Sequence, residues 1–275
     1  MTSFYRNVFW FAKGMKEYSR SGFRSACRSF NLPDLDVDCT GKVFMITGAT
    51  GTLGRVVAIQ LAQRGGTVHL VCRDEEKAQD LKRTITDITE DENSVVAHLV
   101  DMSRPQEVLN FAKKFKEKYG ILHVLVLVTC GSLLMQRLDP VDLQFECMFP
   151  FNGLAAFTQT KRQQAVLVEH YAETYPGIHF SAMHPGWVEP QGVKDAVPKL
   201  LRKVSIRCRS VEEAADTILW LAISRAALKH SSGMFFQDRK TTCPHIPFGK
   251  TKTSLDDEKF FMRNLEEFVN KLGLS

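Results

Sequence analysis

The stretch KVFMITGATGTLG, residues 42–54, decides the fold of this 275-residue chain. Its first six residues are mostly β-branched or apolar, which predicts a short strand buried on both faces. Three glycines spaced three residues apart follow, and then comes the helical pattern RVVAIQLAQR. Glycine lets the backbone turn tightly and approach a ligand closely, and a helix N-terminus offers unpaired N–H groups to an anion. This order of strand, turn and helix is typical of a site for the phosphates of a dinucleotide.

Short apolar runs alternate with helical stretches along the rest of the chain. We expect an amphipathic C-terminal helix, helices at 55–64, 75–87, 104–118, 153–174 and 210–223, and strands at 42–47, 67–72, 94–100, 121–129, 177–183 and 233–237. Such alternation implies βαβ units, because parallel strands need a crossover between them. The sequence therefore predicts an α/β fold, a Rossmann-type doubly wound parallel sheet flanked by helices. We place this single domain at residues 40–275, after an N-terminal extension of residues 1–39.

The residues of the glycine-rich turn are the candidates for binding a dinucleotide: Gly48, Thr50, Gly51, Leu53 and Gly54. Arg73 follows the second predicted strand, 19 residues after Gly54, where the simplest form of the motif has an acidic residue for the ribose hydroxyl. A guanidinium suits a 2′-phosphate, so Arg73 favours NADP(H) over NAD(H), unless it is only a solvated surface residue. Asp101 follows the third predicted strand and is a candidate acceptor for the adenine amine or a cap for the next helix.

The net charge of +5 is confined to one end of the chain. Residues 1–30 contain six basic residues and one acidic residue, so the remaining 245 residues sum to zero. A protein that reads nucleic acid spreads its basic residues over a binding face, so we expect no nucleic-acid partner. The seven cysteines are scattered, with no Cys-x-x-Cys pair. This favours reduced thiols in the cytoplasm and argues against a metal site.

The basic N-terminal segment has the apolar spacing of a helix, with one stripe at Phe4, Val8, Phe11 and Met15. Its longest apolar run is too short to span a bilayer. Three interpretations stay open. The segment is a helix docked on the protein's own body, or an interfacial helix that makes peripheral membrane contact through residues 3–17, or a mitochondrial presequence, which its Arg- and Ser-rich composition would suit.

Residues 40–240 resemble the short-chain dehydrogenase/reductase (SDR) superfamily, on the glycine-rich turn and on the pentad FTQTK, Phe157 to Lys161. The resemblance implies a catalytic tetrad of asparagine, serine, tyrosine and lysine, in which the tyrosine is the general acid/base and the lysine lowers its pKa. Lys161 matches the lysine. Phe157 stands at the tyrosine position, and Cys130 in VTCGS stands at the serine position. Cys130 and His184 are the only nearby candidates for a different proton donor, and a lone cysteine or histidine at a strand end is more often structural.

Between the third predicted strand and this pentad, the chain has fewer residues than the SDR pattern requires. Only 55 residues separate Asp101 from Phe157, and the pattern requires three helices and two strands there, while one βαβ unit alone takes about 30 residues. We therefore expect that one strand–helix unit is missing, together with the tetrad asparagine and the helix through which these enzymes dimerise. Pro190 replaces a threonine that the family commonly uses to hold the nicotinamide carboxamide.

These departures leave several functions open. The resemblance implies an NADP(H)-dependent oxidoreductase acting on an unknown small carbonyl or alcohol, and the altered tetrad implies that catalysis is impaired. The alternatives are a non-catalytic NADPH-binding regulatory or scaffold protein, and a truncated splice or gene-model product.

Overall fold

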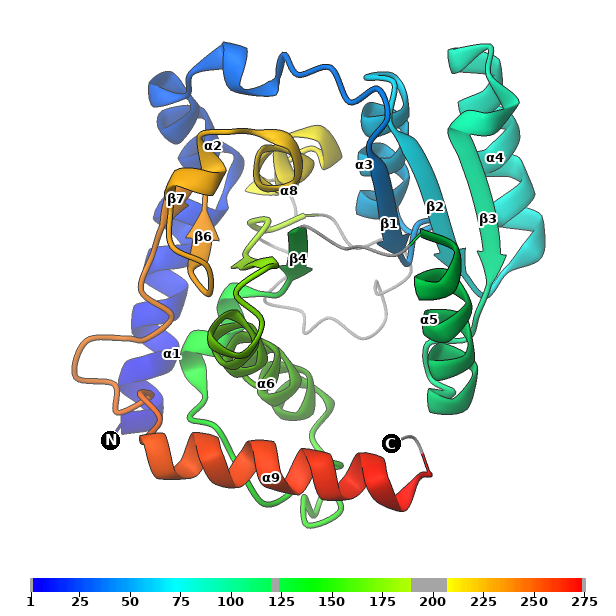
Figure 1. The fold of residues 1–275 in the computed structure, drawn as a ribbon. Helices are drawn as coiled ribbons and strands as arrows, with labels where there is room; N and C mark the ends of the chain where they lie inside the picture. Colours follow the sequence, from blue (N-terminus) through cyan, green and yellow to red (C-terminus); the bar gives the residue numbers. More distant parts are fainter. Residues whose placement is uncertain (1, 120–123, 189–206, 274–275) are drawn as a thin grey trace.

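The strand that opens the glycine-rich stretch is the first of a three-stranded parallel sheet. The computed structural model describes residues 2–119, 124–188 and 207–273. Within this sheet β1 (Val43–Thr47) pairs with β2 (Thr67–Cys72), and β2 pairs with β3 (Val95–Leu99). The crossover helices are α3 (Thr52–Ala62) and α4 (Glu75–Thr89). All three strands therefore end at the same edge of the sheet (Figure 1).

A second sheet holds the later strands in the order β4-β5-β6-β7. Its strands are β4 (Val124–Val128), β5 (His179–Met183), β6 (Phe235–Gln237) and β7 (Lys240–Thr241). The first three run parallel, and β7 returns antiparallel to β6. The crossover from β4 to β5 contains α6 (Gly153–Thr174), whose bounds are those expected from the sequence.

The doubly wound sheet expected from the sequence is divided in two. Within the described ranges no strand pairing joins β1 to β4, and Figure 1 shows the two sheets apart. Apolar residues on one face of β1 are exposed as a result, Val43 by 47% and Met45 by 36%. A shared core still connects the halves, because α8 (Val211–Ile223) packs against α3 and its cluster includes Met183 of β5.

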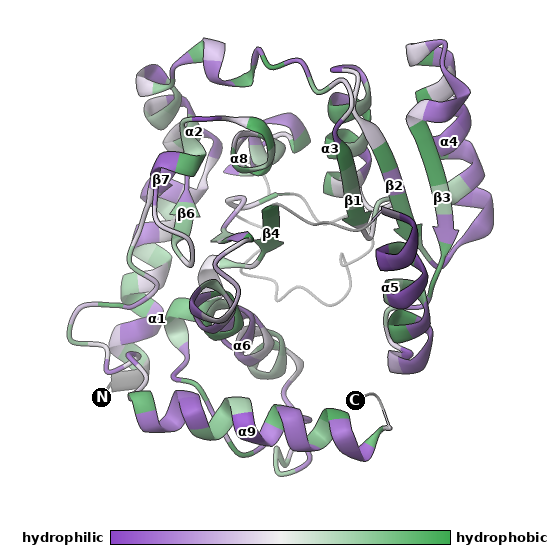
Figure 2. Cartoon of the chain, viewed as in Figure 1, coloured by the Kyte–Doolittle hydropathy of each residue, from purple (hydrophilic) through white to green (hydrophobic). Residues whose placement is uncertain are grey.

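Helices α5 (Pro105–Tyr119) and α9 (Leu255–Lys271) lie on the outside with α4, and Figure 2 shows polar residues along all three. The short 3-10 helices are η2 (Cys27–Ser29), η3 (Leu32–Leu35), η4 (Glu92–Ser94), η5 (Gly131–Met135) and η7 (Ala227–Lys229), and η5 is largely buried. The capping box that opens α8 is present, with Ser210 and Glu213 bonding each other's backbone. The C-terminal helix packs on the body as expected, because Phe261 is buried.

The N-terminal segment is a helix packed on the body. It consists of α1 (Thr2–Lys13), a π-helical turn η1 (Gly14–Tyr18) and α2 (Arg20–Ala26). Phe9 and Trp10 pack against the cluster that covers α6 and β5. Gly14 is required at its position, because a Cβ there would lie 2.2 Å from the ring of Trp187. None of the helices in the described ranges is long and apolar enough to cross a membrane.

Candidate dinucleotide and catalytic sites

The glycine-rich turn has the geometry of a phosphate cradle. Gly48 has a φ of +65°, which favours glycine, and its N–H donates to the carbonyl of Val71 on β2 at 2.9 Å. A Cβ on Gly54 would lie 2.5 Å from the Gly48 oxygen, so only glycine lets α3 approach the turn this closely. Gly51 caps α3 without a side-chain hydrogen bond. The helix therefore begins with its positive dipole end at the turn.

This turn leaves room for a pyrophosphate, and the N–H groups of Gly48 and Gly51 are themselves bonded to the carbonyls of Val71 and Gly48. Gly48 and Gly51 are exposed, and no neighbour lies within 4 Å of the space that a Cβ on Gly48 would fill. Thr50 and Leu53 flank the same opening along the chain and are partly buried. A dinucleotide would place its phosphates against these backbone groups, and its nicotinamide would supply hydride chemistry.

Arg73 and Asp101 lie at the same sheet edge as the turn, since they follow β2 and β3. Arg73 is exposed. The Asp101 carboxylate accepts hydrogen bonds from the N–H and the hydroxyl of Ser103, at 2.9 and 2.8 Å. These bonds are the main reason why the pKa of Asp101 lies below its usual range, and Arg73 adds a smaller lowering. Asp101 thus stabilises the turn before α5 through its bonds to Ser103. It is not the N-cap residue of α5, because that helix begins at Pro105.

The residues expected from the sequence at the tetrad positions lie at the end of β4 and on α6. The Nζ of Lys161 lies 5.6 Å from the ring centroid of Phe157, so the two share one helix face as their spacing predicts. The same Nζ donates to the carbonyl of Val128 at 3.3 Å and to Gln164 Oε1 at 3.0 Å. Burial lowers the pKa of Lys161, and Cys130 opposes that shift. The pair of Phe157 and Lys161 contains no hydroxyl that could exchange a proton with a substrate.

His184 is a packing residue in this structure. It is 1% exposed, and the ring of Tyr18 meets it edge-on with centroids 4.3 Å apart. Burial lowers its pKa to about 3, with smaller contributions from Arg209 and Lys13. Neither ring nitrogen has a partner among the described residues. A substrate cannot reach this imidazole, so the interpretation of His184 as a substitute proton donor is wrong.

Two buried arginines that the sequence did not single out fix the surroundings of these residues. Arg162 donates to the carbonyls of Gln136, Leu133 and Pro244, which holds the segment after β4 on α6. Arg209 pairs with Asp238 at 2.6 Å. Its guanidinium also donates to the carbonyls of Glu17, Tyr18 and Pro185. These partners lie far apart in sequence, so no local pattern could have indicated them.

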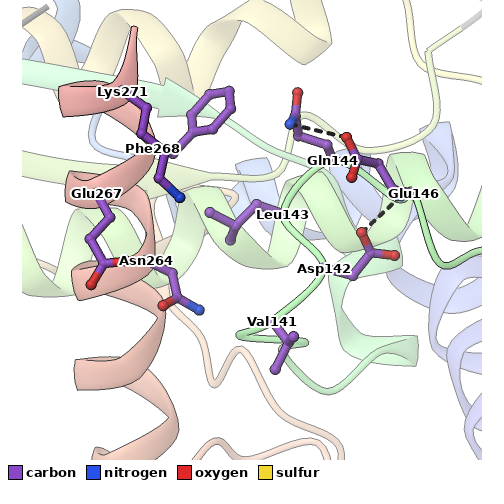
Figure 3. Close-up of a pocket in the computed structure, with 9 residues that line it drawn as sticks. All are labelled: Val141, Asp142, Leu143, Gln144, Glu146, Asn264, Glu267, Phe268 and Lys271. Atoms are coloured by element: carbon purple, nitrogen blue, oxygen red, sulfur yellow. Dashed lines mark hydrogen bonds between the residues drawn. The ribbon is translucent and has the colours of Figure 1, made fainter. Parts of the chain in front are cut away.

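A hollow of about 220 Å³ lies elsewhere, between α9 and the segment before α6 (Figure 3). Its lining includes Asp142, Leu143, Glu146 and Phe268. Neither the glycine-rich turn nor Lys161 contributes to it, so it has no part in the chemistry of those residues. Pro190 falls in 189–206, outside the described residues, and its expected role is untested.

Comparisons with known proteins agree with this geometry. A sequence model of the short chain dehydrogenase family matches residues 42–173. The human protein named dehydrogenase/reductase SDR family member 12 is 37% identical over 315 aligned positions, covering 97% of this chain and 98% of that protein. The chain belongs to the short-chain dehydrogenase/reductase family. Membership in the SDR family implies a nicotinamide dinucleotide, NAD(P)(H), as cofactor.

More distant SDR proteins show the same fold. Human retinol dehydrogenase 12 is 30% identical, covering 88% of this chain and 89% of that protein. A Pseudomonas aeruginosa structure, the RhlG/NADP active-site complex, superposes with a TM-score of 0.56 at 15% identity, covering 74% of this chain and 96% of that one. Hydroxysteroid dehydrogenase from Escherichia coli gives 0.54 at 18% identity, with 74% and 97% covered. These structures support the SDR fold and carry no substrate assignment.

Proposed function

We propose that this SDR chain binds NADP(H) through the glycine-rich turn but reduces carbonyls poorly or not at all. The observation that carries the proposal is the contact between the Phe157 ring and Lys161 at 5.6 Å, where the family pattern has a phenol beside the lysine. A positioned proton donor contributes about 10² to 10⁴ to a rate. Cys130 at the serine position removes a hydroxyl that would hold the substrate carbonyl.

The preference for NADP(H) rests on Arg73. The residue follows β2 at the edge where the turn lies, and its guanidinium is exposed. A 2′-phosphate would gain charge-assisted hydrogen bonds from this side chain, while the simple ribose of NAD(H) would not. Asp101 would lie beside the adenosine half, and Lys161 would contact the nicotinamide ribose.

A missing strand–helix unit explains the divided sheet. The alignment with the human relative has 315 positions, and 97% of this chain is about 267 residues, so about 48 positions lie opposite gaps. One strand and its helix fit in such a length, since a whole βαβ unit takes about 30 or more residues. The missing strand would lie between β1 and β4, and its helix would cover the exposed side chains of Val43 and Met45. The loss would also remove the tetrad asparagine and the dimer helix.

Two related interpretations share these observations. A regulatory or scaffold protein would bind NADPH without turnover, which the occupied amine of Lys161 favours, because Val128 and Gln164 already accept its protons. A truncated product would expose apolar surface that the full family fold covers, as β1 does. We further propose that residues 1–39 are an extension of a single domain at 40–275, in the cytoplasm.

Thermal unfolding with and without nucleotide tests the proposal. We expect 1 mM NADPH to raise the Tm, since a ligand present at 100 times its Kd adds about 2.7 kcal/mol to the free energy of unfolding. NADH should raise it less. Arg73→Ala should weaken NADPH binding about 10- to 100-fold and leave NADH binding unchanged. Arg83→Ala removes another exposed arginine and serves as the matched control.

Failure has distinct forms in this experiment. If neither nucleotide shifts the Tm of the wild-type chain, the dinucleotide site is not functional. If both nucleotides bind equally and Arg73→Ala changes nothing, binding is retained but the assignment of Arg73 is wrong. A steady turnover of NADPH with small aldehydes or ketones would contradict the proposed impairment.

A further inference from the structure

Two large apolar side chains are exposed on two segments that contact each other. Phe4 on α1 is 76% exposed, and Phe248 in the loop between β7 and α9 is 93% exposed. The hydroxyl of Tyr5 donates to the carbonyl of Pro247 at 3.1 Å, which ties this loop to the first turns of α1. Figure 1 shows the loop, in orange, running beside the dark blue start of α1. The two rings therefore belong to one surface.

The loop is a built turn and not a loose connection. Ile246 and Thr251 are buried at its base, and the N–H of Ile246 donates to the Thr251 hydroxyl at 3.2 Å. The Gly249 N–H closes the turn on the Ile246 carbonyl at 2.9 Å. Phe248 lies at the tip with a φ of +58°, a conformation that an aromatic residue seldom adopts. The turn thus holds an aromatic ring outward at a conformational cost.

Helix α1 is apolar on its outer side as well as on its inner side. The inner side packs Phe9 and Trp10 against the core cluster that contains Ile246, so the helix and the turn are anchored in the same core. The outer side carries Phe4 and Val8, and Val8 is 51% exposed. The packing of the helix on the body therefore leaves Phe4 and Val8 exposed, while Phe11 of the same stripe packs on Trp187.

Two lysines, Lys250 and Lys252, are exposed beside the Phe248 turn. The basic charge of residues 1–30 does not all lie here, because Arg20 and Arg24 follow η1 and pair with Glu213. The first turn of α9 contains Asp256, Asp257 and Glu258, of which Asp257 is paired with Arg137. The two lysines would attract an anionic partner to the Phe248 turn.

We propose that Phe4, Val8, Phe248, Lys250 and Lys252 form a docking surface for a bilayer that contains anionic phospholipids. The apolar side chains would enter the boundary between headgroups and acyl chains, and the lysines would contact lipid phosphates. The rings project from a helix and from the tip of a turn, so the surface is convex. A fluid bilayer accepts such projections, whereas a protein partner would need matching pockets.

Vesicle sedimentation with the full chain tests this surface. We expect the wild type to sediment with vesicles of 70% phosphatidylcholine and 30% phosphatidylserine, and to be released by 0.5 M salt, because salt screens the attraction between the lysines and the lipid phosphates. The double substitution Phe4→Ser and Phe248→Ser should weaken binding about tenfold or more. The same change at Phe149 and Phe151, which are exposed in the segment before α6, should leave binding intact.

A fluorescence measurement separates insertion from simple attraction. Phe248→Trp should shift its emission to shorter wavelength and lose access to acrylamide when anionic vesicles are added, with no such change for neutral vesicles. Equal sedimentation of the wild type and the Phe4→Ser, Phe248→Ser variant would overturn the proposal. So would a wild type that does not bind anionic vesicles at all, and a protein would then be the partner to seek.

Discussion

Phe157 and Lys161 lie on one face of α6 and contact each other. The ring and the ammonium lie 5.6 Å apart, within the range of a cation–π interaction, so the phenylalanine stabilises the charge of a lysine that burial disfavours. The contact gives Lys161 a structural reason to persist apart from any reaction.

Restoring the phenol should not restore turnover on its own. On the proposal that Cys130 replaces the tetrad serine and that the tetrad asparagine is lost, we expect Phe157→Tyr to oxidise NADPH with small aldehydes no faster than the Phe157→Leu control. Absorbance at 340 nm measures this. A rise of about 10² or more over Phe157→Leu would show that the rest of the site is intact.

Gly54→Ala should destabilise the fold and abolish nucleotide binding together. Its Cβ would meet the Gly48 oxygen at 2.5 Å and the Ala49 Cα at 2.8 Å, both backbone atoms that cannot move away cheaply. We expect a loss of about 1 to 3 kcal/mol in urea unfolding. Gly177→Ala is the control, because nothing lies within 4 Å of its Cβ position. Equal stability of both variants would contradict the close packing of α3.

At the scale of the elements, Arg209 joins the N-terminal helices to the second sheet. Its side chain is 1% exposed and pairs with Asp238, while three carbonyls accept its other protons. Gly186 makes room for it, since a Cβ there would lie 2.2 Å from Arg209 Nε. One side chain thus connects η1, the segment after β5 and the end of β6.

Arg209→Met should loosen α1 and η1 from the body. Removing one partner of a buried ion pair costs about 3 to 5 kcal/mol, because the other charge stays buried. We expect a lower Tm and faster tryptic cleavage at Lys13 and Lys16. Arg55→Met breaks an exposed pair with Asp80 and should cost less than about 1 kcal/mol. Similar effects of the two substitutions would count against this role for Arg209.

The contact between His69 on β2 and His98 on β3 should make stability depend on pH. Their nitrogens lie 2.8 Å apart, and burial lowers the pKa of His69 to about 4, with His98 and Lys118 adding to the effect. Between pH 6.5 and about 4 the unfolded chain therefore binds a proton that the folded chain does not, so the free energy of unfolding falls as the pH falls.

His69→Gln should flatten this pH dependence. Urea unfolding at several pH values gives the slope of the free energy of unfolding against pH for the wild type and for the variant. Groups that both chains share, such as His184 and His245, contribute equally to the two slopes and drop out of their difference. An unchanged slope would mean that His69 does not titrate in this window.

At the scale of the whole molecule, two small sheets share one core through α8. Val43 and Met45 are exposed on one face of β1, a strand that has no neighbour on its other edge in the described ranges. Unpaired strand edges with apolar side chains promote association between copies.

Met45→Lys should reduce self-association of the purified chain. A charge at the face beside the open edge opposes pairing, and the Tm should change little because the side chain is already partly exposed. Light scattering at a series of protein concentrations measures the self-association. Ile88→Lys alters an equally exposed residue on α4 and should have no effect. Equal association of wild type and Met45→Lys would place the contact elsewhere.

Sequence periodicity predicted the local elements well and their assembly only in part. The strand at 67–72 and the helix at 153–174 match the structure at both ends, because strand and helix periods are local properties. The turn at Gly48 to Gly54 was predictable from glycine spacing. The divided sheet, the Arg209 contacts and the burial of His184 were not, because each depends on residues far apart in the chain.

The division between β1 and β4 has a mechanical consequence. In a continuous parallel sheet, a force that pulls two neighbouring strands apart must break a row of backbone hydrogen bonds. Here the described residues provide no strand pairing between Thr47 and Val124, and the two sheets are joined through the apolar core that contains α8. We expect a pulling force to separate the β1-β2-β3 sheet from the β4-β5-β6-β7 sheet first, while the strand pairing within each sheet stays intact.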